Sequence, residues 1–342
     1  MSRCNILIVT VPTPIYKNKD PDFKPLLDVC KKISKLLKNG DIIAFESTVY
    51  PGATEEICAK ELEKNKRSLK SGVDFFLGYS PERVNPGDKK RTIDKINKVI
   101  SGQNKKVETI LFDIYSKLTK GEIFLAKNIK VAEASKVIEN AQRDINIAFI
   151  NEVAKICSKL NISIYDVLDA SNTKWNFLPF LPGLVGGHCI GVDPYYLSHK
   201  AKELKVDPEV ILSGRRTNDN MPKFIFKEIQ KRLKKKANIL FLGVTFKEDV
   251  PDLRNSKAIE LLSFFRQPKF DVFINDPFIN DDAYIKYKDL IEKSFDAIIL
   301  TVPHTFYKEK FLHIKKLLKK DGILFDIKGI FRNKNMKNYW SL

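Results

Sequence analysis

The sequence predicts an α/β protein in which two parallel-sheet domains flank a helical middle. Three observations lead to this prediction. Short apolar runs closed by turn residues alternate with helical stretches in the first third of the chain, residues 131–160 contain neither Gly nor Pro, and the strand pattern of the first third returns in the last third. Apolar runs of four to eight residues that alternate with helices are typical of parallel sheets.

The first third contains three such runs. We expect strands at residues 5–11, 42–45 and 75–79, with a helix at 26–37 between the first two. Ligands of parallel sheets bind at the carboxyl ends of strands, so residues 10–14 and 47–48 are placed to touch one. Glu82 adds a carboxylate after the third strand. Ordinary turn chemistry explains Pro12 and Pro14 equally well.

The middle of the chain is predicted to be one long helix, residues 131–160, that links domains. Lys136, Asn140 and Arg143 are spaced i, i+4, i+7 and therefore share a face. A solvated stripe would explain any one of them, but the stripe is rich in asparagine and contains only one lysine and one arginine. The stripe therefore favours a functional face over a solvated one. A second helix at 163–170 follows.

An aromatic, proline-bounded loop then leads into the sequence L-V-G-G-H-C-I-G-V-D-P, which begins at Leu184. Gly186 and Gly187 permit a positive φ or a close approach to a ligand. Cys189 beside them fits a covalent nucleophile, because a thiolate adds readily to an aldehyde or acyl carbon. A buried structural cysteine is the alternative, and the loop alone does not decide between them.

The last third repeats the first. Strands are expected at residues 239–242, 272–275, 296–302 and 321–326, with helices at 256–265 and 315–318. I-L-I-V-T-V-P from Ile6 matches I-I-L-T-V-P from Ile298, and each is followed by a helix and a second strand. This internal similarity predicts two related sheet domains.

The repeat also predicts a difference between the two domains. Roughly sixty residues with two strands precede the T-V-P strand in the last third, whereas only five residues precede Ile6. We therefore expect the first sheet domain to lack its opening βαβ unit. That unit would carry a G-x-G-x-x-G phosphate-binding turn, and none of the 15 glycines forms that pattern.

Composition indicates a soluble globular protein, because 43% of its 342 residues are hydrophobic and 30% are charged. We expect it to stay in the cytoplasm, because the sequence predicts neither a membrane span nor a signal peptide. No apolar run reaches the length of a membrane span, and residues 5–11 are too short for the core of a signal peptide. The five cysteines have neither C-x-x-C spacing nor an even number, and the four histidines do not cluster with them. We expect reduced thiols and no metal site.

The formal net charge of +18 does not by itself predict a nucleic-acid partner. Lysines are spread along the chain, and no basic stripe with interleaved aromatic residues accompanies them. A small anionic substrate such as a nucleotide would use the same positive field.

Seven motifs in order resemble the UDP-glucose/GDP-mannose dehydrogenase family, and the resemblance covers nearly the whole chain. They are T-V-P-T-P at Thr10, E-S-T-V-Y-P-G at Glu46, S-P-E-R-V-N-P-G at Ser80, K-V-I-E-N at Lys136, G-G-H-C-I-G-V-D-P at Gly186, G-R-R-T-N-D at Gly214 and F-K-E-D-V-P-D-L-R-N-S at Phe246. Val192 stands where enzymes for UDP-glucose carry lysine, which favours the subgroup that oxidises UDP-N-acetylhexosamines for capsule and O-antigen sugars.

The resemblance implies a fold of two Rossmann-like domains around a central helical domain that forms a homodimer. The corresponding boundaries are 1–126 for the remnant of an NAD-binding domain, 127–222 for the helical domain with the cysteine loop, and 223–342 for a UDP-sugar-binding domain. It also implies an NAD-dependent, four-electron oxidation at C6 of a UDP-N-acetylhexosamine, through a thiohemiacetal and a thioester on the cysteine.

The resemblance assigns roles to individual residues. The expected catalytic residues are Cys189 as nucleophile, Lys136 and Asn140 at the oxyanion, Asp193 acting through water, Glu82 as the base for thioester hydrolysis, and Thr48 orienting water or nicotinamide. The expected cofactor contacts are Thr10, Val11, Pro12, Thr13, Ser47, Thr48 and Arg254. The expected substrate contacts are Glu82, Arg83, Lys136, Asn140, Phe180, Gly183, Gly186 and Lys247.

Two other interpretations remain open from the sequence. A chain without its opening unit could bind UDP-sugar and dimerise without holding NAD. An unrelated basic binding module is the third. The epimer of the sugar is also open, because epimers differ at one hydroxyl and residues outside the motifs would distinguish them.

Overall fold

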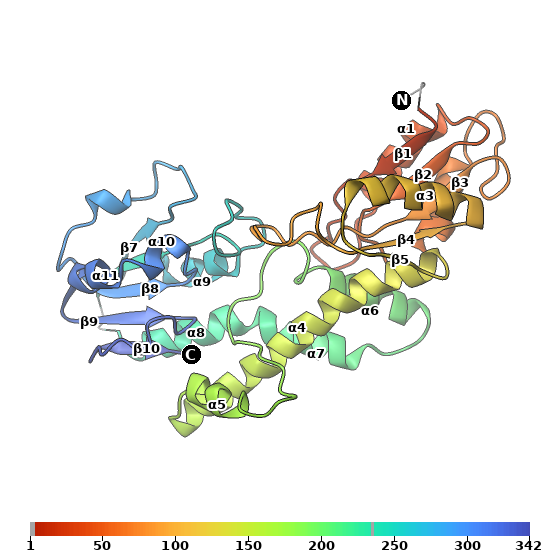
Figure 1. Ribbon diagram of the computed structural model, residues 1–342. Helices are drawn as coiled ribbons and strands as arrows, with labels where there is room; N and C mark the ends of the chain where they lie inside the picture. The colour runs from red at the N-terminus through yellow and green to blue at the C-terminus, as the bar shows by residue number, and fades with distance from the viewer. Residues whose placement is uncertain (1–3, 234–235) are drawn as a thin grey trace. The chain divides into compact units, whose positions relative to one another are not determined.

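The computed structural model describes residues 4–233 and 236–342, which form two compact units (Figure 1). The first unit comprises Met1–Gln142 and Val192–Leu212, and the second comprises Arg143–Gly191 and Ser213–Leu342. Each unit contains one five-stranded sheet. The predicted α/β class with two sheet domains and a helical middle is confirmed.

The first sheet has the strand order β1-β2-β3-β4-β5. Its strands are β1 (Ile6–Val9), β2 (Ile42–Phe45), β3 (Phe76–Tyr79), β4 (Lys98–Gly102) and β5 (Ile123–Leu125). The first three are parallel, but β4 runs antiparallel to β3. The three strands that the sequence predicts are thus parallel, as expected, whereas β4 was not among the predicted elements. A parallel return needs a long crossover, usually a helix, and none lies between β3 and β4.

Helices cover this sheet by burying one apolar face each. They are α1 (Lys24–Ser34), a π-helical turn at Thr54–Cys58 that continues into α2 (Ala59–Leu62), α3 (Lys105–Leu118) and α6 (Asp193–Glu203). In α1, Leu26, Cys30 and Ile33 recur at helical spacing and are all buried. They pack in one core cluster with Ile43 and Phe45 of β2.

The second sheet is parallel throughout, in the order β10-β9-β8-β6-β7. Its strands are β6 (Ala237–Leu242), β7 (Phe270–Asn275), β8 (Phe295–Leu300), β9 (Leu318–Asp326) and β10 (Tyr339–Ser341). The strand β10, which ends beside the C-terminus in Figure 1, had no counterpart in the predicted elements. The chain passes from β6 to β7 on one side and then to β8 on the other. The gap between β6 and β8 is thus the point where strand order reverses, and ligands of such sheets bind there.

The second unit also contains short helices. They are α5 (Ile164–Ser171), most of α7 (Glu209–Asp219), α8 (Met221–Gln230), α9 (Lys257–Phe265), a 3-10 turn at Tyr287–Asp289, α10 (Thr305–Lys308) and α11 (Phe311–Leu317). The hydroxyl of Ser256 caps α9 by accepting hydrogen bonds from the amides of Ala258 and Ile259. Leu261 and Phe265 of α9 are buried in the core of this unit.

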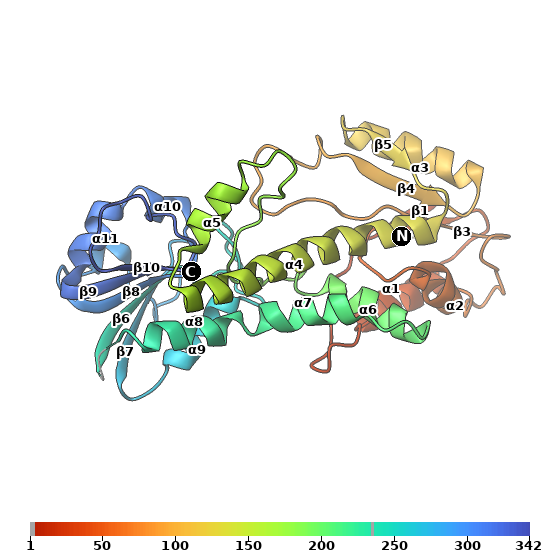
Figure 2. The same cartoon turned by 90° about the horizontal axis from the view of Figure 1, so that it is seen from below.

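The longest helix, α4 (Ile129–Leu160), is continuous in both views (Figure 2). The boundary between the two units falls after Gln142, within this helix. A solvated stripe does not describe its polar residues, because Lys136 is 8% exposed and Asn151 is fully buried, whereas Arg143 is exposed. Within the part of the chain that is described, no helix combines the length and the apolar character that crossing a membrane requires.

Candidate functional site

The carboxyl ends of β1 and β2 meet at one edge of the first sheet, as their parallel pairing requires. The Ser47 hydroxyl donates a 2.6 Å hydrogen bond to the carbonyl of Val11 and so joins the two loops. Thr10 and Pro12 are exposed, Val11, Thr13 and Thr48 are partly exposed, and Ser47 is buried. Hydroxyl groups and backbone atoms are therefore accessible to a ligand at this edge. The hydrogen bond of Ser47 holds the two loops together.

A buried polar cluster lies beneath the same edge. The Tyr115 hydroxyl donates to Glu46 Oε1 at 2.5 Å, and Lys98 Nζ lies 3.5 Å from that oxygen. Lys98 is fully buried and also lies 4.9 Å from the centre of the Tyr115 ring. Burial and the Glu46 carboxylate raise the pKa of Tyr115 well above its usual range. Sequence analysis missed this cluster because Lys98 lies outside every motif.

Glu82 and Arg83 follow β3 and have separate partners. Glu82 accepts a 2.5 Å hydrogen bond from the amide of Val84, within its own loop. The Arg83 guanidinium lies 2.7 Å from Glu139 Oε1 on α4, which ties the loop to that helix. Both side chains are partly exposed.

Three of the predicted catalytic residues come together where α4 meets the start of α6. Asn140 Nδ2 donates a 2.5 Å hydrogen bond to Asp193 Oδ2. Burial raises the pKa of Asp193 to about 6, although the Lys136 ammonium and the Asn140 amide both oppose this increase. Asp193 can therefore exchange a proton near neutral pH, and a cation and an amide donor lie beside it.

A second buried carboxylate on α4, Glu133, was not predicted. Its two oxygens accept hydrogen bonds from the amides of Gly52, at 2.5 Å, and Thr54, at 2.9 Å. Burial raises its pKa to about 7, while these hydrogen bonds act in the opposite direction. Glu133 therefore holds the turn that follows Thr48. The only sequence signal was an acidic residue in an otherwise apolar stretch of helix.

In the second unit, Cys189 is partly exposed and forms no disulfide. Two glycines before it allow the loop to approach its neighbours closely. Gly187 has φ +84°, and a side-chain Cβ there would lie 2.7 Å from Phe246 Cδ2. A Cβ on Gly186 would lie 2.5 Å from the carbonyl oxygen of Asn255. A side chain at either position would clash with its neighbours, so both positions require glycine.

The loop after β6 returns to the cysteine loop. The rings of His188 and Phe246 meet edge to face with 5.5 Å between centres. Arg254 donates to Asp252 at 2.6 Å and lies near enough to Cys189 for the two charges to interact. A guanidinium in this position favours the thiolate form of the cysteine.

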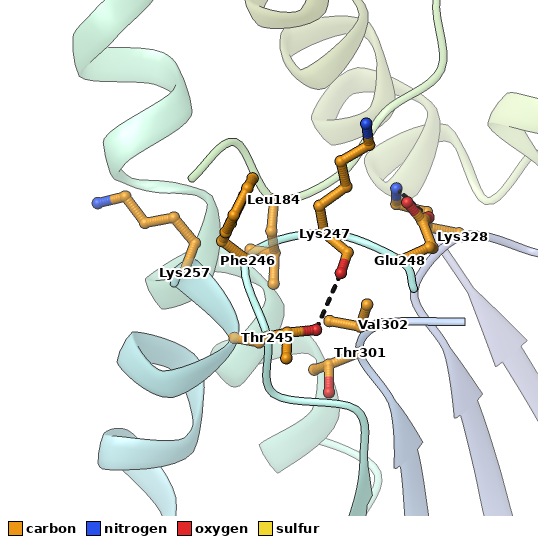
Figure 3. Close-up of a pocket in the computed structure, with 10 residues that line it drawn as sticks. Leu184, Thr245, Phe246, Lys247, Glu248, Lys257, Thr301, Val302 and Lys328 are labelled. Atoms are coloured by element: carbon orange, nitrogen blue, oxygen red, sulfur yellow. Dashed lines mark hydrogen bonds and ion pairs between the residues drawn. The ribbon is translucent and has the colours of Figure 1, made fainter. Parts of the chain in front are cut away.

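A small pocket lies in the second unit at the point where strand order reverses (Figure 3). Residues after β6 and after β8 line it, together with Leu184 of the cysteine loop. The lining residues are Leu184, Thr245, Phe246, Lys247, Glu248, Lys257, Ala258, Thr301, Val302 and Lys328. Three of them are lysines, and Lys328 pairs with Glu248 at 2.6 Å. Lys257 pairs with Glu260 at 2.6 Å and with Asp219 at 3.0 Å, so two of the three ammonium groups already have carboxylate partners. The position of the pocket at a strand-end switch point is nevertheless where ligands of such sheets bind.

Other predicted residues lie around this pocket or in the other unit. The pocket is lined by Lys247 and by Leu184, which follows Gly183 in the chain. Phe180 packs against the core of the second unit. Cys189, Gly186 and Arg254 belong to the same unit. Lys136, Asn140, Asp193, Glu82 and Thr48 belong to the first unit.

Three family models match the chain in order. The NAD binding domain of the UDP-glucose/GDP-mannose dehydrogenase family matches residues 1–119, its central domain matches 130–220, and its UDP binding domain matches 240–333. The match of the NAD-binding model does not show that the opening βαβ unit is absent. That absence stays a prediction. The three-domain boundaries that were predicted also stay a prediction.

Similar proteins agree with these matches. The chain is 49% identical to Protein CapL of Staphylococcus aureus, over 97% of this chain and 81% of that protein. It is 46% identical to UDP-N-acetyl-D-glucosamine 6-dehydrogenase of Pseudomonas aeruginosa, over 96% and 81%. The structure of UDP-D-ManNAc dehydrogenase from Pyrococcus horikoshii superposes with a TM-score of 0.88 at 29% identity, over 99% of this chain and 81% of that one.

Sequence identity of this extent, three domain models in order and a shared fold lead to one conclusion. The chain belongs to the UDP-glucose/GDP-mannose dehydrogenase family of NAD-dependent enzymes.

Proposed function

We propose that the protein is a nucleotide-sugar 6-dehydrogenase that oxidises the C6 alcohol of a UDP-N-acetylhexosamine to a carboxylate, for use in surface polysaccharide. The observation that carries this proposal is the cluster of Lys136, Asn140 and Asp193, in which a buried carboxyl with a pKa of about 6 lies beside a cation. The names of the similar enzymes from Pseudomonas aeruginosa and Pyrococcus horikoshii support the substrate class.

The residues at the edge of the first sheet fit one side of a dinucleotide. The loops after β1 and β2 are joined by the Ser47 hydrogen bond, and the exposed Thr10 and partly exposed Thr48 can face a ligand. Thr10, Val11, Pro12, Thr13, Ser47 and Thr48 would contact NAD there. A four-electron oxidation releases two hydrides, and two NAD+ molecules bound in turn would each accept one of them.

Cys189 would act as the nucleophile. Its thiolate would add to the C6 aldehyde to give a thiohemiacetal, and oxidation of that adduct would leave a thioester. Arg254 nearby supports the thiolate form. Lys136 and Asn140 would stabilise the oxyanion of the adduct. Asp193 would exchange protons through water, which its raised pKa permits.

Hydrolysis of the thioester would need a base and an oriented water. We assign the base to Glu82 and the orientation of the water to Thr48, both of which follow strand ends of the first sheet. Glu82 accepts a hydrogen bond from Val84 in the described structure, so it would have to share or release that contact to take a proton.

The lysine-lined pocket would bind the UDP part of the substrate. Lys247 and Lys328 line this pocket and would contact the phosphates, for which Lys328 would have to exchange its pairing with Glu248. Phe180, Gly183 and Gly186 would line the sugar, and Arg83 and Arg254 would add contacts. The aliphatic Val192 supports the acetylhexosamine subgroup over UDP-glucose.

The active form would be a homodimer that buries α4. In the second unit, Phe149, Ile156 and Leu160 lie on one side of α4 at spacings of seven and four residues and are 63%, 52% and 62% exposed. Burial against a second copy would remove this apolar surface from water. Light scattering of Phe149→Asp against wild type checks this, because a variant with unchanged dimer mass would exclude the surface.

The central test uses purified protein with NAD+ and UDP-N-acetylglucosamine. We expect absorbance at the NADH band and a uronic acid product in wild type, and neither in Cys189→Ser, which should still bind the UDP-sugar by calorimetry. Acid production by Cys189→Ser at the wild-type rate would reject the nucleophile. UDP-sugar binding without NAD+ binding in wild type would instead support the alternative of a binding protein.

A further inference from the structure

A buried polar network in the second unit contacts the loop that leads to Cys189. It is formed by Asp144 and Asn151 of α4 and by Arg215 and Asn218 of α7, and all four side chains are at most 2% exposed. Arg215 and Asn218 belong to the G-R-R-T-N-D motif, to which the proposed reaction gives no role. Buried polar residues in such number are costly unless every group is paired, which points to a specific use.

The network is connected by short hydrogen bonds. Asp144 Oδ1 accepts from Arg215 Nη1 at 2.6 Å and from Asn218 Nδ2 at 2.7 Å. Asn218 Oδ1 in turn accepts from Asn151 Nδ2 at 2.8 Å. The ion pair therefore fixes the orientation of the Asn218 amide, and Asn218 fixes that of the Asn151 amide.

Asn151 is the member that reaches the loop. Its Oδ1 accepts from the amide of Gly183 at 2.8 Å, and its Nδ2 donates to the carbonyl of Gly183 at 3.0 Å. One side chain thus binds both backbone groups of a single residue. Gly183 has φ +152°, a conformation that L side chains rarely adopt, so this contact holds an unusual backbone.

Gly183 lies at the start of the loop that carries Cys189. Leu184 follows directly and lines the lysine-rich pocket. Gly187 forms a second anchor, because its amide donates to the carbonyl of Asn255 at 3.3 Å. Cys189 lies two residues beyond that anchor, so the path of the backbone between Gly183 and Gly187 sets where the thiol emerges.

We propose that Asn151, braced by Asn218 and the Asp144–Arg215 pair, is a positioning residue that sets the backbone path of the Gly183–Cys189 loop. It acts on the pocket through Leu184 and on the thiol through the loop, and it touches no reacting atom. The consequence for turnover rests on the proposed function. The placement of the loop does not rest on the proposed function, and it can be measured without substrate.

The test is alkylation of the native protein by iodoacetamide, with each cysteine followed separately by mass spectrometry. In Asn151→Ala we expect Cys189 to react about tenfold faster than in wild type, as loss of a loop anchor worth about 1.4 kcal/mol would produce. Cys157 is buried in the core of the same unit and should stay protected, and the exposed Cys4 should react at the same rate in both proteins.

Matched variants separate positioning from loss of stability. Asn176→Ala changes an exposed asparagine of the preceding loop and should leave the Cys189 rate unchanged. Asn151→Asp keeps the shape and an acceptor for the Gly183 amide but removes the donor, so it should give a smaller acceleration. It also replaces Asn151→Ala as the deciding variant should the latter fail to fold.

The outcomes are distinct. An unchanged Cys189 rate in a folded Asn151 variant overturns the proposal, and so does acceleration of Cys189 and Cys157 together, which would mean general loosening of the core. With UDP-N-acetylglucosamine and NAD+, Asn151→Ala should also lower kcat/KM while Asn176→Ala does not. A protein without turnover would reject the proposed function, yet the alkylation rates would still decide the role of Asn151.

Discussion

Replacement of Asp193 by asparagine should change how stability depends on pH. The folded protein raises the pKa of this buried carboxyl from 3.8 to about 6. The folded state therefore holds its proton more tightly than the unfolded state, so the contribution to stability is complete below pH 3.8 and is lost as pH rises through 6. A shift of about two units corresponds to about 3 kcal/mol.

The amide side chain in Asp193→Asn does not titrate and can still accept the hydrogen bond of Asn140. The free energy of unfolding of Asp193→Asn minus that of wild type should therefore increase by about 2 kcal/mol between pH 4.5 and 7.5, the part of the total that falls in this range. Urea unfolding followed by circular dichroism measures it. Pulse alkylation of the buried Cys30 and Cys58 assigns the transition to the unit that holds Asp193.

Asp113→Asn, an exposed position on α3 of the same unit, is the control and should show no such trend. A difference between Asp193→Asn and wild type that stays constant with pH would refute the reasoning. It would mean that Asp193 ionises at an ordinary pH despite its burial.

Three further substitutions test other contacts. Lys136→Ala should lower kcat far more than it raises KM, because an oxyanion partner acts mainly in the transition state, and a change confined to KM would make Lys136 a binding residue. Lys98→Met leaves the Glu46 carboxylate without its buried cation and should destabilise the first unit by roughly 3–5 kcal/mol in urea; wild-type stability would contradict this. In Gly187→Ala the alanine must adopt the positive φ of Gly187 and its Cβ clashes with Phe246, so the substitution should lower the free energy of unfolding by roughly 1–3 kcal/mol. Thermal unfolding measures this, and an unchanged melting temperature would show that the loop relaxes freely.

Local signals in the sequence were sufficient for most of the elements. The strand predicted at 42–45 is β2 itself, and the helix predicted at 131–160 differs from α4 by two residues at its start. Apolar runs and helical spacing are properties of neighbouring residues, so they can be read without the fold. The sequence also indicated that Gly186 and Gly187 permit a close approach, but the residues that approach them, Asn255 and Phe246, are distant in the chain and were not predicted.

Contacts between distant residues could not be predicted in this way. Arg215 and Asp144 are 71 residues apart, and Glu133 lies 79 residues from the Thr54 amide that it binds. Their charges are visible in the sequence, but their pairing depends on how the helices pack. The antiparallel direction of β4 is a further case, since it follows from the absence of a crossover helix and not from the composition of the strand itself.

The first unit is assembled from two separate stretches of chain, and this has a consequence for synthesis. Its second stretch ends at Leu212, seventy residues after the first stretch ends at Gln142. At the usual 5–20 residues per second, these take roughly 4–14 s to make. During that time the Pro14 carbonyl lacks the Tyr196 hydroxyl, and Asn140 lacks Asp193. A ribosome-bound chain that has been made as far as Gln142 but not yet to Leu212 should therefore expose the incomplete first unit to a nascent-chain chaperone.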